Sequence, residues 1–285
     1  MLLQNNLRGF QHLGIPVVDM AVAKDWYTRH FGFETAYETT LGEGPEAVQI
    51  AFLRRQDILL EFYRLTGADL EEVKGRAHGH IDHFAIDVLD LRAAMQRLQA
   101  EGVQLDPETP DEPVSLPQFY ARGVEYVFFK SPNGEKVELN QRLDLNPARR
   151  TENLNGWAHL GIPVTDLPRS MAFYSRFGFE SEMQAIIPAG EESVRAAMMT
   201  LNGFTLELYQ LLPADLEGIR ARQDGHVDHF TLDVADVDQA FTELKEAGMV
   251  PLEDEPVQLP FWENGVRYFN VRGPDGEKIE FNQKL

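Results

Sequence analysis

The chain has 285 residues, no cysteine, and 46 acidic against 26 basic side chains, for a net charge of −20. The lack of cysteine excludes disulfides and thiolate metal ligands. So negative a surface repels phosphate backbones and anionic lipid, and we expect neither nucleic acid nor a membrane as a partner. The first ten residues do not resemble a signal peptide, and we expect a cytoplasmic protein.

The first quarter of the chain has the pattern of one strand, one helix and three further strands. Asp19 is a good helix N-cap, and Gly32 stands where a helix-ending glycine belongs. We predict a strand at 10–18, a helix at 20–30, and strands at about 34–41, 46–54 and 57–65. Pro16 has no amide hydrogen, so the first strand is expected to end or bulge there.

The same plan returns three more times along the chain. The second unit is predicted to have a strand at 83–89, a helix at 91–101, and strands at about 112–120, 124–130 and 135–141. Equivalent units begin near residues 157 and 227, with helix caps at Asp166 and Asp236. The four units span about 8–65, 80–142, 155–212 and 226–284, grouped into domains 1–145 and 153–285, with linker segments at 66–79, 143–155 and 212–224.

Three short sequences occur twice, which indicates an internal duplication. The sequence HLGIPV at 12–17 returns at 159–164, and GHIDHF at 79–84 returns as GHVDHF at 225–230. The sequence GEKVELNQ at 134–141 returns as GEKIEFNQ at 276–283. Histidines and glutamates are among the residues kept in both copies.

These histidines begin the first strand of each unit, and the glutamates lie in the last strand among apolar neighbours. They are His12, Glu61, His83 and Glu138 in the first half and His159, Glu207, His229 and Glu280 in the second. A single histidine or glutamate in a strand is more often structural, but all four recur. A carboxylate buried on the inner face of a sheet is costly without a partner. Two imidazoles and two carboxylates suit a divalent Ni, Zn, Co, Mn or Fe ion, so we predict such a metal ion as cofactor.

The unit plan and these recurring residues resemble the vicinal oxygen chelate superfamily, which includes glyoxalase I, bleomycin-resistance proteins and extradiol dioxygenases. The most specific stretch is SPNGEKVE at 131–138 and its mate GPDGEKIE at 273–280. The resemblance implies an α+β fold in which four βαβββ units form two cupped mixed sheets, with the eight residues above as metal ligands. Two pairings of the units stay open: one with two and three with four, or one with four and two with three.

The resemblance also implies an activity. Glutamate at positions 61 and 207 points to the glyoxalase I type, a metal-dependent lyase or isomerase that transfers a proton next to a metal-bound carbonyl through an enediolate. Glu138 and Glu280 would be the catalytic bases, with Glu61 and Glu207 as their opposing partners. The direct substrate would be the hemithioacetal of methylglyoxal and glutathione. The alternatives are an extradiol-type ring-cleaving dioxygenase, an epimerase or sugar isomerase, and a non-catalytic small-molecule binding protein.

Five further side chains are candidates for substrate binding: Phe119, Tyr126, Trp262, Tyr268 and Arg122. The aromatic residues precede or begin the last two strands of their halves, where they would line a pocket mouth or pack in the core. No convincing pair of arginines for an anionic thiol stands out in so acidic a chain.

The residues just before two of the candidate ligands are expected to lie outside the metal site. Strand alternation places His80 and Asp82 on the face opposite His83, and it places His226 and Asp228 on the face opposite His229. A homodimer is a further expectation.

Overall fold

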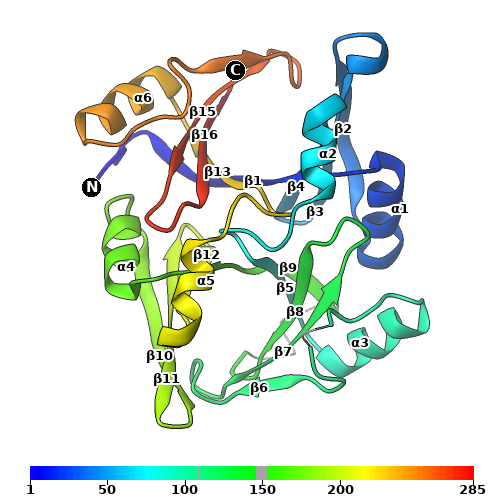
Figure 1. The fold of residues 1–285 in the computed structure, drawn as a ribbon, viewed down its shortest axis with the longest axis vertical. Helices are drawn as coiled ribbons and strands as arrows, with labels where there is room; N and C mark the ends of the chain where they lie inside the picture. The colour runs from blue at the N-terminus through cyan, green and yellow to red at the C-terminus, as the bar shows by residue number, and fades with distance from the viewer. Residues whose placement is uncertain (108, 146–152) are drawn as a thin grey trace.

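Two strongly curved eight-stranded mixed sheets make up most of the structure. The computed structural model describes residues 1–107, 109–145 and 153–285. Helices lie around the outside of the sheets (Figure 1). This architecture confirms the α+β fold with two cupped mixed sheets.

Each of the four units contributes a helix and four strands. The first unit has β1 (Leu7–Pro16), α1 (Met20–Phe31), β2 (Glu34–Leu41), β3 (Val48–Arg55) and β4 (Ile58–Arg64). The second has β5 (His83–Val88), α3 (Leu91–Ala100), β6 (Val114–Leu116), β7 (Val124–Lys130) and β8 (Lys136–Arg142). The third has β9 (Leu154–Pro163), α4 (Leu167–Ser175), β10 (Glu180–Ala189), β11 (Glu192–Leu201) and β12 (Phe204–Gln210). The fourth has β13 (His229–Val234), α6 (Val237–Glu246), β14 (Val257–Leu259), β15 (Val266–Arg272) and β16 (Lys278–Lys284).

The local signals in the sequence set the helix ends. The Asp19 carboxylate accepts hydrogen bonds from the first amides of α1, and Gly32 ends that helix at a φ of 71°. The caps at Asp166 and Asp236 are confirmed in the same way, each accepting from the amide three residues on. Strand β1 ends at Pro16, as expected of a residue that cannot donate a ladder hydrogen bond.

The structure refines four predicted segments. The strand predicted at 112–120 is only Val114–Leu116, because the chain turns at once and Tyr120 has a φ of 51°. The linkers at 66–79 and 212–224 contain the short helices α2 (Gly67–Lys74), η3 (Pro213–Asp215) and α5 (Leu216–Arg220). The linker predicted at 143–155 falls partly outside the described residues, and β9 begins within it.

The strand order decides between the two pairings of the units. The first sheet runs β14-β15-β16-β13-β1-β4-β3-β2, so it joins unit one to unit four. The second runs β10-β11-β12-β9-β5-β8-β7-β6 and joins unit two to unit three. The contacts between units are the antiparallel pairs β1–β13 and β5–β9. Each half of the chain therefore contributes to both sheets; we name the sheet of units one and four the first cup and the other the second cup.

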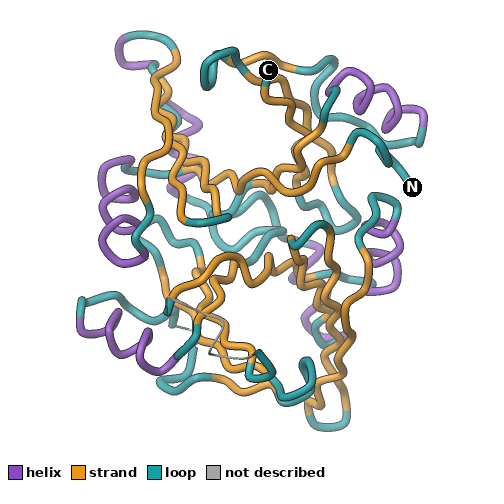
Figure 2. The backbone as a smooth tube through the Cα atoms, turned by 180° about the vertical axis from the view of Figure 1, so that it is seen from behind, coloured by secondary structure: helices purple, strands orange, loops and turns teal. Residues whose placement is uncertain are grey.

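The two cups stand back to back. Their open sides point in opposite directions in Figure 2, and their convex sides face each other. One hydrophobic cluster fills the space between them, with Leu13 and Phe62 from the first cup and Phe84 and Leu160 from the second. The concave sides hold two smaller clusters of their own. Burying the convex sides together leaves the concave sides free to form cavities.

Two buried tyrosine–glutamate pairs also join the cups. The Tyr27 hydroxyl on α1 donates to Glu135, just before β8, at 2.8 Å, and Tyr174 donates to Glu277 at 2.5 Å. Both glutamates are fully buried, so each tyrosine hydroxyl gives a partner to a carboxyl group that water cannot reach. In the part of the chain that the structure describes, no helix is long and apolar enough to cross a membrane.

Candidate metal centres

The four central strands of each sheet place one histidine or glutamate each on the concave side. The first cup has Glu280, His229, His12 and Glu61 on β16, β13, β1 and β4. The second cup has Glu207, His159, His83 and Glu138 on β12, β9, β5 and β8. Adjacent strands bring these side chains to one point on the floor of the cup. Each set combines two residues from each half of the chain.

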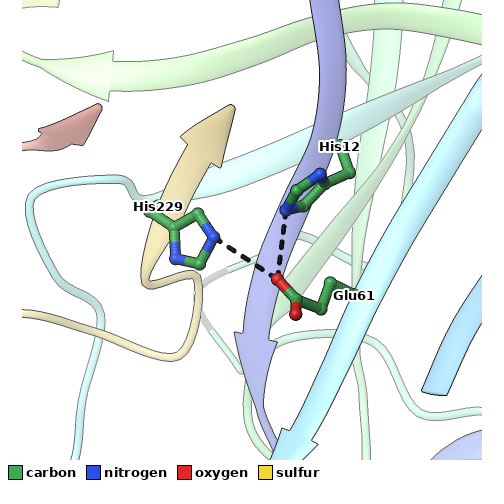
Figure 3. Close-up of side chains that lie close together, drawn as sticks. All are labelled: His12, Glu61 and His229. Carbon is green, nitrogen blue, oxygen red and sulfur yellow. Dashed lines mark hydrogen bonds and ion pairs between the residues drawn. The ribbon is translucent and has the colours of Figure 1, made fainter. Parts of the chain in front are cut away.

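In the first cup, the side chains meet around Glu61. Its Oε2 lies 3.0 Å from His12 Nε2 and 3.7 Å from His229 Nε2 (Figure 3). Glu280 lies 3.8 Å from His12 Nε2 and 3.7 Å from His229 Nε2. All four residues are at least nine-tenths buried.

In the second cup, the equivalent atoms are more evenly spaced. His83 Nε2 lies 3.3 Å from His159 Nε2, 3.3 Å from Glu138 Oε2 and 3.5 Å from Glu207 Oε2. His159 Nε2 lies 3.5 Å from Glu138 Oε2 and 3.4 Å from Glu207 Oε2. Both imidazole Nε2 atoms therefore face both carboxylates across one small space.

The spacings of 3.3–3.5 Å in the second cup are close to those around a shared metal ion, and three of the four in the first cup are wider, at 3.7–3.8 Å. Nitrogen and oxygen ligands at about 2.1 Å from an ion lie about 3.0–3.4 Å from their neighbours. In addition, His229 Nε2 is buried and has no hydrogen-bond partner among the described residues. Such a nitrogen is costly unless something accepts its lone pair or its proton. His12, Glu61 and His229 form one group that can hold a metal ion, and His83, His159 and Glu207 form the other.

The electrostatics of both floors favour a cation. Burial raises the pKa of Glu61, but the hydrogen bond from His12 and the charge of the nearby His229 outweigh it and lower that pKa to about 2. Burial lowers the pKa of His229, but the hydrogen bond with Asp228 and the nearby Glu61 carboxylate raise it to about 10. The pKa of His83 is raised to about 10 in the same way, by Asp82 and Glu207 against burial. The carboxylates that hold protons on these imidazoles also attract a divalent ion to the same place.

The prediction for Asp82 and Asp228 was wrong. Asp82 Oδ2 lies 3.2 Å from His83 Nδ1, and Asp228 Oδ2 lies 3.0 Å from His229 Nδ1. Strands β5 and β13 begin only at the histidines, so the alternation assumed for the preceding residue does not apply. A carboxylate on Nδ1 orients the ring and leaves Nε2 to bind a metal ion.

Basic side chains from the linkers complete each aspartate's surroundings. Arg76, which follows α2, donates to Asp228 at 2.8 Å, and Arg222, which follows α5, donates to Asp82 at 2.8 Å. Sequence reasoning missed both arginines, because each reaches an aspartate more than a hundred residues away. His80 and His226 lie apart from the candidate ligands, packed against Gly276 and Gly134.

Glycine in the repeated HLGIPV sequence makes room for a histidine of the other unit. A Cβ on Gly14 would stand 1.9 Å from the His229 ring, and one on Gly161 would stand 2.0 Å from the His83 ring. No other amino acid leaves space for the ring at these two positions. The repeated glycine is visible in the sequence, but the histidine that each glycine faces is not.

A cavity lies above each candidate metal centre. The second cup holds about 400 Å³, and Phe119, Tyr126 and all four candidate ligands line it. The first cup holds about 360 Å³, and its lining includes Trp262, Tyr268 and all four candidate ligands. Arg122 is exposed and lines neither cavity.

Some polar neighbours of the floor were not anticipated. Asn140 Nδ2 donates to Glu138 Oε1 at 2.8 Å, and Asn282 Nδ2 donates to Glu280 Oε1 at 2.9 Å. The spacing of two along a strand, which puts both side chains on one face, was the available signal. The first cup also has Thr231, whose hydroxyl lies 3.0 Å from His12 Nε2.

Comparisons with known proteins agree with this architecture. The family model described as "Glyoxalase/Bleomycin resistance protein/Dioxygenase superfamily" matches residues 9–139 and 156–281. The crystal structure of glyoxalase I from Zea mays superposes with a TM-score of 0.71 at 19% sequence identity, covering 98% of this chain and 94% of that one. The uncharacterized protein YwbC of Bacillus subtilis (strain 168) is 38% identical over 61 residues, which are 21% of this chain and 46% of that protein.

Proposed function

Because the chain belongs to the Glyoxalase/Bleomycin resistance protein/Dioxygenase superfamily, we propose that it is a metal-dependent lyase or isomerase of the glyoxalase type. The proposed reaction moves a proton between two adjacent carbons, one carrying a carbonyl and the other a hydroxyl group. The observation that supports it most directly is the meeting of two histidines and two glutamates under a cavity in each cup.

The candidate ligands would hold the metal ion at the floor. In the second cup these are His83, His159, Glu207 and Glu138, and in the first cup His12, His229, Glu61 and Glu280. A divalent ion bound there supplies a Lewis acid that stabilises negative charge on a carbonyl oxygen. Asp82 and Asp228 keep the imidazoles oriented for this role.

Glu138 and Glu280 would move the proton. Asn140 fixes one oxygen of Glu138, so the other oxygen, Oε2, is held toward the histidines and the cavity floor. That oxygen would take the proton from the carbon beside the carbonyl and return it to the neighbouring carbon. Glu138 is 3% exposed, so bulk water has little access to exchange the proton. Glu207 and Glu61 would be the opposing carboxylates.

The substrate of the direct glyoxalase I reaction would be the hemithioacetal of methylglyoxal and glutathione. A hemithioacetal substrate would bind with its two oxygens at the floor, and the group derived from the thiol would extend along the cavity wall. The aromatic residues Tyr126 and Tyr268, which line the two cavities, would contact the substrate.

A second candidate function is an Fe(II)-dependent dioxygenase. Two histidines and one carboxylate, as in the group of His83, His159 and Glu207, are the ligand set of many non-haem iron oxygenases. The fourth donor argues against it, because Glu138 Oε2 lies within 3.5 Å of both histidines and takes a position that dioxygen chemistry needs open.

An assay on metal-reconstituted protein tests the proposed function. Thioester formation from methylglyoxal hemithioacetals is expected for the wild type and is expected to fall at least about 100-fold in the Glu138→Gln, Glu280→Gln double variant. Glu246→Gln, at an exposed position on α6, is the control and should keep full activity. Oxygen uptake with a catechol and no isomerisation of any hemithioacetal would favour the dioxygenase instead.

A further inference from the structure

We infer that the second cup takes an α-hydroxycarbonyl compound whose remaining part is uncharged and apolar, rather than an anionic thiol adduct. This inference rests on the proposed function and names its substrate class. It follows from how the charged groups around the cavity are already paired, and from the composition of the wall above the floor.

The one lysine and the one arginine that line the second cup, among the described residues, both form ion pairs with the same buried aspartate. Arg222 Nη1 lies 2.8 Å from Asp82 Oδ1 and also donates to the Gly79 carbonyl at 2.8 Å. Lys136 Nζ lies 3.5 Å from Asp82 Oδ2. Asp82 is 6% exposed, so it needs these cations as compensation for its own burial. Among the described residues, no other lysine or arginine lines this cavity.

The wall above the floor is apolar on both sides. One side is formed by β10 and β11, with Ile187, Val194 and Met198, and the other by the β6–β7 region, with Phe119 and Phe128. A carboxylate placed against these apolar side chains would lose its water without gaining a cation. Burying an unpaired charge in this way is strongly unfavourable. An aromatic or aliphatic group is stabilised by the same contacts.

In the first cup, too, the lining cation is already paired with aspartates. Its one lining lysine, Lys278, contacts Asp228 at 2.7 Å and Asp224 at 3.4 Å, and the described lining contains no arginine. Glutathione carries two carboxylates and would meet no available cation in either wall. The net charge of −20 adds to the repulsion at long range.

The test compares two pairs of probes, and in each pair one member carries carboxylate groups that the other lacks. Phenylglyoxal hemithioacetals made with 2-mercaptoethanol and with glutathione have the same reacting carbons, and their turnover by metal-reconstituted protein is compared as kcat/KM. Benzohydroxamic acid and 4-carboxybenzohydroxamic acid chelate a metal without reacting, and their binding is compared by calorimetry. We expect the uncharged member of each pair to be favoured at least tenfold.

A matched pair of variants locates the preference in the second cup. Ile187→Arg places an unpaired cation on the cavity wall, and Ile186→Arg places the same charge on the opposite, 65% exposed face of β10. Ile187→Arg is expected to improve binding of the carboxylated hydroxamate relative to the uncharged one by about tenfold, and Ile186→Arg is expected to leave the ratio unchanged. Both positions lie on the edge strand, and circular dichroism checks that both variants fold.

The outcomes separate the two proposals. Tighter binding of the carboxylated hydroxamate, equal binding of both, or a higher kcat/KM for the glutathione adduct would overturn the inference. If neither hemithioacetal reacts but the uncharged hydroxamate binds better, the proposed reaction is wrong and the preference for an uncharged group stands. If the metal-loaded protein binds neither hydroxamate, both proposals fail.

Discussion

The imidazole of His83 lies directly against the Cα of Gly161, a residue of the other half of the chain. A Cβ at position 161 would stand 2.0 Å from Cε1 of that ring, far inside van der Waals contact. The repeated glycine of the HLGIPV sequence is therefore required by the position of the histidine ring in the candidate metal centre, rather than by the strand in which it lies.

Gly161→Ala is expected to displace His83 and to weaken metal binding in the second cup by about 100-fold, since a shift near 1 Å at a functional group has effects of that size. The first cup should be unchanged. Metal affinities are measured by competition with a chromophoric chelator. Gly218→Ala is the control, because an added Cβ there meets nothing within 4 Å. If Gly161→Ala leaves the metal affinities of both cups unchanged, His83 is not a ligand.

Asp82→Asn tests the orienting role of the aspartates. It removes the carboxylate from His83 Nδ1, and it leaves Arg222 beside a neutral side chain. We expect metal affinity in the second cup to fall 10- to 100-fold, which is the usual effect of losing such a partner. Asp228→Asn should weaken metal binding only in the first cup, so each variant is the control of the other. Equal losses in both cups would point to global destabilisation instead.

Glu277→Gln tests the buried tyrosine–glutamate pair through the pH dependence of stability. Burial raises the pKa of Glu277 from 4.5 to about 7, against the hydrogen bond from Tyr174 that lowers it. Between these values the folded protein keeps a proton that the unfolded chain has released, so this contribution to stability is present at low pH and is lost as the pH rises toward 7.

Glutamine cannot ionise and still accepts the Tyr174 hydrogen bond. Between pH 5 and 8, the free energy of unfolding should therefore fall less in Glu277→Gln than in the wild type. The difference between the two losses should be at most about 3 kcal/mol. Urea titrations at several pH values measure it. Glu246→Gln, on an exposed part of α6, should keep the wild-type slope. A slope in Glu277→Gln as steep as in the wild type would mean that this carboxyl is ionised when folded.

The sequence was informative wherever the structure depends on neighbouring residues. Helix ends follow from single caps such as Asp19, and strand ends follow from Pro16, so the elements were predicted to within a few residues for most of the chain. The duplication separated the histidines and glutamates from ordinary strand residues. The eight candidate ligands were named on that basis, and the structure brings them together in two groups of four.

The pairing of the units was not predictable in this way. Both pairings join the first strand of one unit to the first strand of another, and the linkers that would distinguish them are of similar length. The roles of Arg222 and Gly161 depend on that pairing, since each acts on a residue of another unit. The local alternation that misplaced Asp82 failed because its strand begins one residue later.

The central claim is that each metal centre takes ligands from both halves of the chain, and two double variants test it most directly by metal content. His12→Ala with His229→Ala removes two ligands of the first cup only, and His12→Ala with His83→Ala removes one ligand from each cup. With about two equivalents bound by the wild type, the first pair should retain about one equivalent and the second pair almost none. The reverse result, or no metal bound by the wild type after reconstitution with Ni, Zn, Co, Mn or Fe, would contradict the account.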